Sequence, residues 1–207
     1  MSNAVVVLLS LLQWLRQPLA MIDRAKAAAA LEAFLRALGL EPEADPELRG
    51  TGRRVADAFA DEFLRGYEVD ARAALRRHLV DATTGLVVVR DVAVVTMCPH
   101  HLLPAQGKAT IAFAPRARAV GLGAVVTLVE DLARRLILQE TLGEDIAEAL
   151  QVELDARWVA CRLVLSHGCM TARGERAHGT QVETLALRGL EDPRDRSEAL
   201  RIVLANP

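Results

Sequence analysis

The sequence predicts an α+β fold in which helices cover one face of an antiparallel sheet. Two observations indicate this class. Residues 22–79 carry apolar side chains at helical spacing, whereas valine-rich extended segments begin at about residue 86. These extended segments form two pairs, and a helical stretch at residues 122–154 separates them. The expected order is therefore helices, one hairpin, two helices, a second hairpin and a final helix.

Three helices are expected before the sheet. In residues 22–38 the apolar side chains fall on one face, and Gly39 is placed to end that helix. Thr51 can cap a second helix through its side-chain oxygen, and this helix is expected to end at Gly66. Residues 71–79 add a short third helix.

Four strands are expected, because four segments are rich in β-branched residues or alternate between apolar and polar side chains. They are residues 86–97, 108–113, 158–166 and 181–187. The first two form an antiparallel hairpin, and the segment from Cys98 to Pro104 is its turn. A four-stranded sheet has two open edges, which natural proteins cover or pair. We therefore expect oligomerisation through these edges.

Two helices between the hairpins and one at the end complete the pattern. Residues 122–136 place apolar side chains at three- and four-residue steps. Thr141 followed by Glu144 predicts a capping box at the start of the next helix. Asp192 and Pro193 have the residue types of an N-cap and a first helical position.

The chain is expected to divide into residues 1–20, a helical extension at residues 21–80 and a main domain at residues 81–207. Residues 4–12 are largely apolar but too short to span a bilayer, which takes about 20 residues. No basic region precedes them, as a signal peptide would require. Residues 1–20 are interpreted either as a tag remnant or mis-assigned start, with Met21 as the true start, or as an interface-forming helix.

Composition excludes several classes of partner. The net charge is −2 at pH 7, and only 3% of the residues are aromatic. We therefore expect no surface for nucleic acid or for an anionic membrane, and none for stacking bases. The three cysteines are an odd number and form no disulfide framework. A reducing cytoplasm is the expected location.

Two short motifs concentrate the metal-binding residue types. Residues 98–101 (Cys-Pro-His-His) and 166–169 (Ser-His-Gly-Cys) hold three of the five histidines and two of the three cysteines. A catalytic zinc keeps three protein ligands of these types and one open position. The predicted zinc ligands are Cys98, His101 and Cys169. His100 and His167 are predicted to supply protons beside the open position.

The alternative interpretation is that both cysteines are small buried apolar residues and that the histidines are ordinary core or surface groups.

If the chain stays extended after residue 166, His167 and Cys169 point to the same side, since strand side chains alternate. Cys161 lies within an alternating strand and is expected in the core. His78 and His178 have no partner in the sequence.

Gln139, Glu140 and Arg173 are candidate binding residues. A carboxylate such as that of Glu140 could accept two N–H donors from a guanine-like edge, and the alternative is a solvated polar loop. A guanidinium beside a metal loop, such as that of Arg173, could clamp a phosphate, and the alternative is a surface arginine.

Residues 89–189 closely resemble GTP cyclohydrolase I, a homo-oligomeric enzyme of the tunnelling fold. The matching motifs are Cys98-x-His100-His101-Leu102-x-Pro104, Gly107-Lys108, Gly121-Leu122, Arg134-Arg135-Leu136, Gln139-Glu140, His167-x-Cys169 and Arg173-Gly174. A further match, Thr51-x-x-Arg54-Val55-Ala56, resembles the family's entry to an early helix. The resemblance covers about residues 25–204.

The resemblance implies the tunnelling fold, in which N-terminal helices precede a four-stranded antiparallel sheet with two helices inserted between its hairpins. Residues 81–207 would be the catalytic domain. In the family, five subunits join their sheets into a barrel and two such rings stack. This implies a homo-decamer with active sites at subunit boundaries.

The resemblance also implies a role for each candidate residue. It makes Cys98, His101 and Cys169 zinc ligands, His100 and His167 acid/base groups, Gln139 and Glu140 guanine contacts, and Arg54 and Arg173 phosphate contacts. In the implied reaction a zinc-activated water adds to carbon 8 of the guanine of GTP. The imidazole ring opens, formate leaves, and 7,8-dihydroneopterin triphosphate forms.

The chain departs from the family pattern at the triphosphate. Gly123, Ala124 and Thr127 stand where the family has Ser, Lys and Arg, and Asp57 stands where it often has a basic residue. The metal and proton-transfer residues are intact. We therefore expect zinc-dependent hydrolysis of GTP, with two alternatives. One is a zinc hydrolase of the same fold acting on a different or less phosphorylated purine or pterin. The other is a non-catalytic oligomer that binds a purine or pterin.

Overall fold

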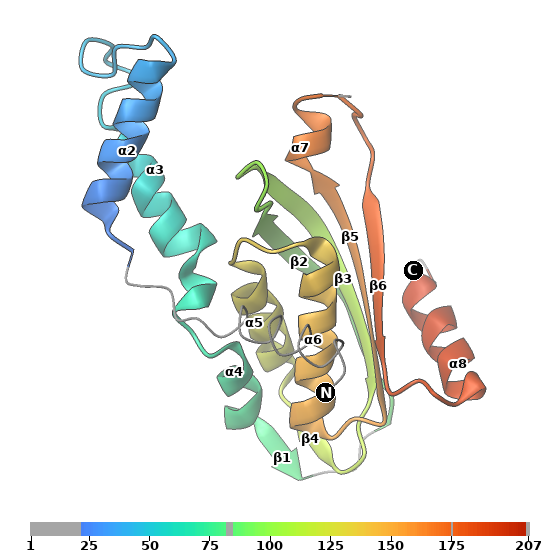
Figure 1. Ribbon diagram of the computed structural model, residues 1–207. Coiled ribbons are helices and arrows are strands. Elements are labelled where there is room, and N and C mark those ends of the chain that lie inside the picture. The colour runs from blue at the N-terminus through green and yellow to red at the C-terminus, as the bar shows by residue number, and fades with distance from the viewer. Residues whose placement is uncertain (1–21, 82–84, 175, 206–207) are drawn as a thin grey trace, which may run out of the picture. The chain divides into compact units, whose positions relative to one another are not determined.

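The computed structural model describes residues 22–81, 85–174 and 176–205. These residues form two compact units that divide between Glu62 and Phe63. Figure 1 shows their helices and strands. The first unit is helical, and the second contains both sheets. No helix in these ranges is both long and apolar enough to cross a membrane. Residues 1–20, with their two interpretations, lie outside the described residues.

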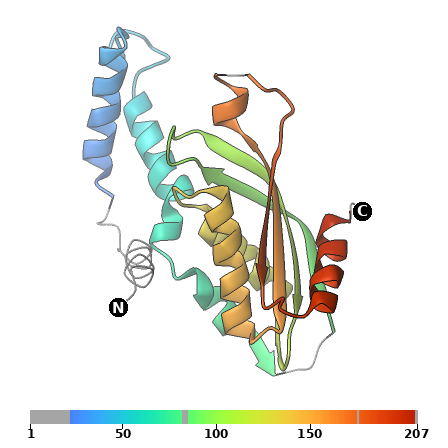
Figure 2. The same cartoon turned by 45° about the vertical axis from the view of Figure 1, so that its right-hand side comes forward.

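Two helices of the first unit, α2 (Arg24–Ala37) and α3 (Thr51–Ala58), lie side by side (Figure 1, Figure 2). Gly52 lets their backbones approach, because a Cβ at this position would lie 2.5 Å from the carbonyl oxygen of Ala28. The Gly52 N–H donates to the Glu32 carboxylate at 2.9 Å. The contact therefore requires glycine.

Asp57, one of the positions at which the sequence departs from the resemblance, joins these two helices. Its carboxylate contacts Arg53 at 2.6 Å and Arg24 at 3.3 Å. Arg24 also contacts Asp61 at 2.5 Å, in the π-helical turn η1 (Phe59–Phe63) that follows α3. The hydrogen bond from Arg53 is the main cause that lowers the pKa of the Asp57 carboxyl. The Asp57 carboxylate is thus bound by two arginines of the same unit.

A four-stranded antiparallel sheet forms the centre of the second unit, in the order β2-β3-β5-β6. Its strands are β2 (Val87–Met97), β3 (Pro104–Ala114), β5 (Trp158–His167) and β6 (Val182–Arg188). Helices α5 (Leu122–Ala133) and α6 (Gln139–Leu154) cover one face, and α8 (Pro193–Leu204) packs on the other (Figure 1, Figure 2). The predicted α+β class and the insertion of two helices between two hairpins are confirmed.

Alternation of side chains along the strands produces two separate apolar clusters. Ile111 and Leu163 belong to the larger cluster, which includes the buried faces of α5 and α6. Trp158 and Ala160 belong to the smaller one, together with Val203 of α8. Trp158 is fully buried, and its indole Nε1 has no hydrogen-bond partner in the described chain.

Arginine side chains fix the end of α8 to the sheet. Arg90 on β2 donates to the carbonyl oxygen of Ile202 at 2.9 Å and to that of Ala205 at 3.1 Å. Arg162 on β5 donates to the carbonyl oxygen of Val203 at 3.3 Å. Carbonyl groups in the last turn of a helix lack intrahelical donors, so these arginines satisfy them.

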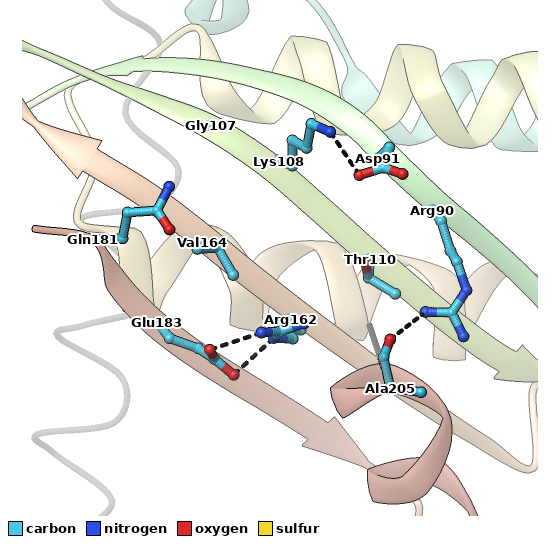
Figure 3. A pocket seen from close by; sticks show the side chains of 10 residues that line it. All are labelled: Arg90, Asp91, Gly107, Lys108, Thr110, Arg162, Val164, Gln181, Glu183 and Ala205. Atoms are coloured by element: carbon cyan, nitrogen blue, oxygen red, sulfur yellow. Dashed lines mark hydrogen bonds and ion pairs between the residues drawn. The ribbon is translucent and has the colours of Figure 1, made fainter. Parts of the chain in front are cut away.

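A hollow of about 620 Å³ lies on the same face of the sheet, beside the end of α8 (Figure 3). Figure 3 shows that its charged side chains face one another. Arg162 makes two hydrogen bonds to Glu183, at 2.7 and 2.9 Å, and Lys108 contacts Asp91 at 2.9 Å. These charged side chains therefore pair with one another within the protein.

A second sheet of two short strands was not predicted. β1 (Leu79–Asp81) pairs antiparallel with β4 (Arg118–Val120). Each strand has three residues, too few for a periodic signal in the sequence. The helix α4 (Ala71–Arg77) leads into β1, and ion pairs join it to α6. These elements place the end of α4 beside the start of α5, where the N–H of Gly121 lies 3.3 Å from the carbonyl oxygen of His78.

Two predicted helix ends are confirmed. Asp192 is the N-cap of α8, and its carboxylate accepts the N–H of Arg194 at 2.8 Å. Gly39 follows α2 with φ of 80°, a left-handed conformation that favours glycine.

Two predicted helix starts are wrong. α6 begins at Gln139 with Leu138 as its N-cap, so Thr141 and Glu144 lie inside the helix and form no capping box. Thr51 is the first residue of α3, and no side chain caps that helix. Tertiary contacts determine the start of α6, because the Gln139 side chain is bound to the sheet.

The sheet tolerates no side chain at Gly107 in β3. A Cβ there would lie 2.0 Å from the carbonyl oxygen of Val164 on β5. We expect Gly107→Ala to lower the free energy of unfolding by about 1–3 kcal/mol, because the strands must move apart. Gly85→Ala is the matched control, since no atom of the described residues lies within 4 Å of its Cβ position. Urea denaturation measures both, and equal stability of the two variants would contradict the expected clash.

Candidate metal centre and substrate pocket

The turn between β2 and β3 folds back on itself and brings His101 to Cys98. The Cys98 N–H donates to the Leu103 carbonyl oxygen at 2.9 Å, and the Leu102 N–H donates to the Cys98 carbonyl oxygen at 2.9 Å. Leu102 has φ of 52°, in the left-handed region that non-glycine residues rarely adopt. As a result the Cys98 Sγ and the His101 Nδ1 lie 3.9 Å apart.

The end of β5 supplies Cys169. In the sheet register His167 pairs with Ala105, so the end of β5 lies beside the start of β3 and the adjoining turn. β5 stops at His167, and Cys169 lies in the short helix α7 (Gly168–Thr171). The chain from His167 to Cys169 is therefore not extended, and the expectation that an extended chain would turn both side chains to the same side does not apply. Gly168 permits the close approach, because a Cβ there would lie 3.0 Å from the carbonyl oxygen of Pro104.

Cys98, His101 and Cys169 form a group that one metal ion can join. One ligand atom from each residue lies within 4.8 Å of the other two. Ligands of a tetrahedral zinc are roughly 3.5–3.8 Å apart, given the usual zinc–sulfur and zinc–nitrogen distances. The 3.9 Å between Cys98 and His101 is close to that value. The sequence prediction that these three residues converge is thus matched by their placement.

The surroundings of the Cys169 thiol disfavour its thiolate form in the absence of a cation. Burial raises the pKa of the Cys169 thiol, and the neighbouring Cys98 sulfur raises it further. A divalent cation opposes both causes, because its charge stabilises thiolates directly. Cys161 lies apart from this group. It is fully buried, and burial raises the pKa of its thiol to about 12.

Gln139, at the start of α6, is a bridge between the sheet and His167. It is 3% exposed. Its Nε2 donates to the carbonyl oxygens of Leu163 at 3.1 Å and Val182 at 3.0 Å, and to the Thr184 hydroxyl at 3.1 Å. The two carbonyl groups can only accept, so they fix which end of the amide faces them.

The Oε1 of Gln139 therefore faces His167, whose Nε2 lies 2.7 Å away. An amide oxygen only accepts, so the Nε2 of His167 must carry a hydrogen. In the neutral ring this leaves Nδ1 as the acceptor. The role of Gln139 toward His167 could not be found from sequence, since its partners are backbone carbonyls and a threonine on two distant strands.

A pocket of about 220 Å³ joins these groups. Its lining includes Cys98, His100, Gln139, Glu140, His167 and Cys169. Glu140 and His100 are exposed at its surface. Glu140 makes no hydrogen bond or ion pair within the described ranges, so its carboxylate is available to a ligand. Most of the predicted site residues are thus gathered in one place.

The two predicted phosphate contacts, Arg173 and Arg54, do not line the pocket. Arg173 lies beside the metal group, with its guanidinium 2.9 Å from the Nε2 of His101. Arg54 belongs to the first unit, where it donates to the carbonyl oxygens of Arg49 at 2.8 Å and Glu47 at 3.2 Å.

The fold and these residues together define an α+β protein with a Cys-His-Cys candidate metal centre beside a polar pocket. Comparison with known proteins gives the family. The chain matches the family model described as GTP cyclohydrolase I over residues 27–204. The chain belongs to the GTP cyclohydrolase I family.

Relatives named GTP cyclohydrolase 1 are similar over most of the chain. The protein of Rhodopirellula baltica is 38% identical over 88% of this chain and 80% of its own length. That of Leifsonia xyli is 38% identical over 87% and 95%, and that of Carboxydothermus hydrogenoformans 34% over 88% and 96%. A solved structure of the archaeosine synthase QueF-Like in the apo form aligns with a TM-score of 0.43 and 18% identity, over 52% of this chain and 97% of that chain.

Replacing Gln139 tests its role in the pocket. We expect Gln139→Leu to lower the free energy of unfolding by about 1–3 kcal/mol, because the carbonyl groups of Leu163 and Val182 lose the hydrogen bonds that the Gln139 amide donates. The matched control is Gln181→Leu, at an exposed position. Urea denaturation followed by circular dichroism measures both variants. A Gln139→Leu protein as stable as the control would contradict the hydrogen-bond network described above.

Proposed function

We propose that this protein is a GTP cyclohydrolase I that opens the imidazole ring of GTP, releases formate and forms 7,8-dihydroneopterin triphosphate. One observation carries the proposal: in a member of this family, the Cys98, His101 and Cys169 ligand atoms lie within 4.8 Å of one another. His167 and Glu140 line the same pocket. The residues proposed for metal binding, for proton transfer and for base recognition thus lie close together.

We propose zinc as the metal. Two thiols and one imidazole fit zinc, which prefers sulfur and nitrogen ligands. Three protein ligands leave a fourth position open, as in catalytic rather than structural zinc sites. Zinc bound there supplies Lewis acidity and lowers the pKa of a bound water.

His167 is proposed to move protons around the opening ring. Its Nε2–H is held by Gln139 at 2.7 Å, so the ring orientation is set and Nδ1 can accept a proton. In this role Gln139 is a positioning residue. His100, exposed on the same pocket, is proposed to assist near the ribose ring oxygen.

Guanine recognition is proposed for Glu140 and for the start of α6. The Glu140 carboxylate can accept two parallel N–H donors of a guanine edge. The side-chain amide of Gln139 is already bonded to the sheet and to His167, so any contact of this residue with the base is proposed to use its backbone. Arg173 and Arg54 are proposed to contact phosphates.

A homo-oligomer is proposed, because β2 and β6 are open edges of the sheet. A decamer is the form that the sequence resemblance implies. The cytoplasm is the proposed location, and no nucleic acid or membrane partner is proposed. The domain division proposed from sequence is a catalytic domain at residues 81–207 behind a helical extension at residues 21–80.

A second function is kept because of the residues at the start of α5. Gly123, Ala124 and Thr127 provide no cation, so a less phosphorylated purine is the alternative substrate for the same zinc chemistry. Ala124 is only 5% exposed, whereas Thr127 is exposed. Position 127 is therefore the better place to add a positive charge.

Turnover of zinc-loaded protein with GTP, GDP, GMP and guanosine tests the proposal. Formate release and the fluorescence of the oxidised pterin are followed. We expect product from GTP, and a loss of about 10²–10⁴-fold in kcat for His167→Ala, which removes the proton-transfer group. Product only from the less phosphorylated compounds would favour the second function. No product from any of them, with zinc bound, would leave a binding protein.

Thiol protection tests the metal site without measuring activity. We expect Ellman's reagent to react with two of the three cysteines in the folded, metal-free protein, because the buried Cys161 has a pKa of about 12. One equivalent of zinc should protect both reactive thiols. Cys98→Ser should abolish this protection, while Cys161→Ser should keep it. Zinc-independent reactivity of all the thiols would contradict the assigned ligands.

A further inference from the structure

A hollow of about 340 Å³ lies where the end of α4 meets the start of α5, outside the metal pocket. Arg77 and His78 line it from the α4 side. Gly121, Gly123 and Thr127 line it from the α5 side. The hydrogen bond between Gly121 and the carbonyl of His78 holds the two sides together.

The charge of this hollow is positive and uncompensated. In α4, Arg72 contacts Glu148 at 3.0 Å and Arg76 contacts Glu153 at 2.8 Å. Arg77, the last residue of the same helix, has no carboxylate partner within the described ranges, and no acidic residue lines the hollow. The hollow between α4 and α5 thus differs from the one beside α8, in which Asp91 pairs with Lys108 and Glu183 pairs with Arg162.

The α5 side leaves room for a ligand. Among residues 22–81, 85–174 and 176–205, no atom lies within 4 Å of a Cβ built on Gly123. The Thr127 hydroxyl is bonded to the Gly123 carbonyl oxygen at 3.0 Å, within its own helix. Arg77, His78, Gly123 and Thr127 are all exposed. A ligand of the size of a phosphate chain can therefore enter and meet both basic side chains.

The hollow and the metal pocket lie at opposite ends of α5. The hollow lies at Gly121–Thr127, and the pocket begins at Ile137, beyond the other end of that helix. The 12 residues of α5 span about 18 Å. A nucleotide held with its base on Glu140 by a second copy of the chain could place its phosphates in this hollow, and the mixed-oligomer experiment below distinguishes that copy from the same one.

We propose that Arg77 and His78 bind the phosphate groups of a nucleotide held in the metal pocket of a neighbouring copy. This inference rests on the proposed function. The two residues provide on α4 the positive charge that positions 124 and 127 of α5 lack. Arg77 can donate several N–H groups to phosphate oxygens, and His78 adds a ring N–H. The pair thus selects phosphorylated substrates.

Kinetics of Arg77→Gln tests the inference. We expect KM for GTP to rise about ten-fold or more, because a charged donor to phosphate is lost, with kcat changed less than about two-fold. The inhibition constant of guanosine, which has no phosphate, should not change. Arg196→Gln, an exposed position on α8, is the control with the same change in net charge. An unchanged KM in Arg77→Gln, or equal effects on GTP and guanosine, would overturn the inference.

Rescue separates charge from structure. The double variant Arg77→Gln/Thr127→Arg puts a cation back into the same hollow from the α5 side. We expect it to recover most of the GTP affinity, and Arg77→Gln/Thr127→Gln to recover none. Equal affinity of the two double variants would contradict a role for positive charge at this place.

Mixed oligomers test the contribution from a neighbouring copy. Co-expression of Arg77→Gln with His167→Ala creates sites that combine His167 of one chain with Arg77 of the other. We expect a component of activity with the wild-type KM in the mixture. If all activity in the mixture has the KM of Arg77→Gln, Arg77 does not bind a nucleotide held by a neighbouring copy, and the inference that two copies share the nucleotide is wrong.

Tripolyphosphate binding distinguishes failure of this inference from failure of the proposed function. We expect calorimetry to show binding that Arg77→Gln weakens about ten-fold or more and that GTP competes with. Arg77-dependent binding in a protein that turns over no GTP would overturn the proposed function alone. Turnover of GTP without Arg77-dependent binding of tripolyphosphate would overturn only the inference that this hollow binds phosphates. Binding that GTP does not displace would exclude the substrate as its ligand.

Discussion

The register of β3 is the constraint on which the site depends. β3 lies between β2 and β5, and its first residues pair with Met97 on one side and His167 on the other. A one-residue slip would turn every side chain of a strand to the opposite face. Residues 98–101 come directly after β2, and residues 166–169 span the end of β5. Two segments about seventy residues apart in sequence thus meet because one strand holds both neighbours in place.

Elements with a periodic signal could be predicted from the sequence, and the two three-residue strands could not. The four main strands and the inserted helices were expected within a few residues of their observed bounds. β1 and β4 were missed because three residues carry no period, and the start of α6 was displaced because Gln139 bonds to two strands. Local patterns such as Thr141 with Glu144 lose to such tertiary contacts.

The candidate site shows the same division. Residue types and spacing were sufficient to nominate Cys98, His101 and Cys169, because soft ligands are rare in this chain. The orientation of His167 was not accessible, since it depends on carbonyl groups that any residue could supply. No motif in the sequence singled out Arg77. The proposal for this residue depends on the lining of the hollow, which in the described part of the chain contains no acidic residue and has small residues on the α5 side. Absence of a partner is a property of the fold rather than of a motif.

The packing of Trp158 makes the protein a natural spectroscopic probe of α8. Its indole is fully buried and its Nε1 has no hydrogen-bond partner in the described part of the chain, so few polar groups surround it to stabilise the excited state. The emission should therefore lie toward the blue and move to longer wavelength when α8 leaves the sheet and water enters. Trp14 is the one other tryptophan in the sequence. With Trp14 replaced by phenylalanine, fluorescence would report the detachment of this single helix separately from global unfolding.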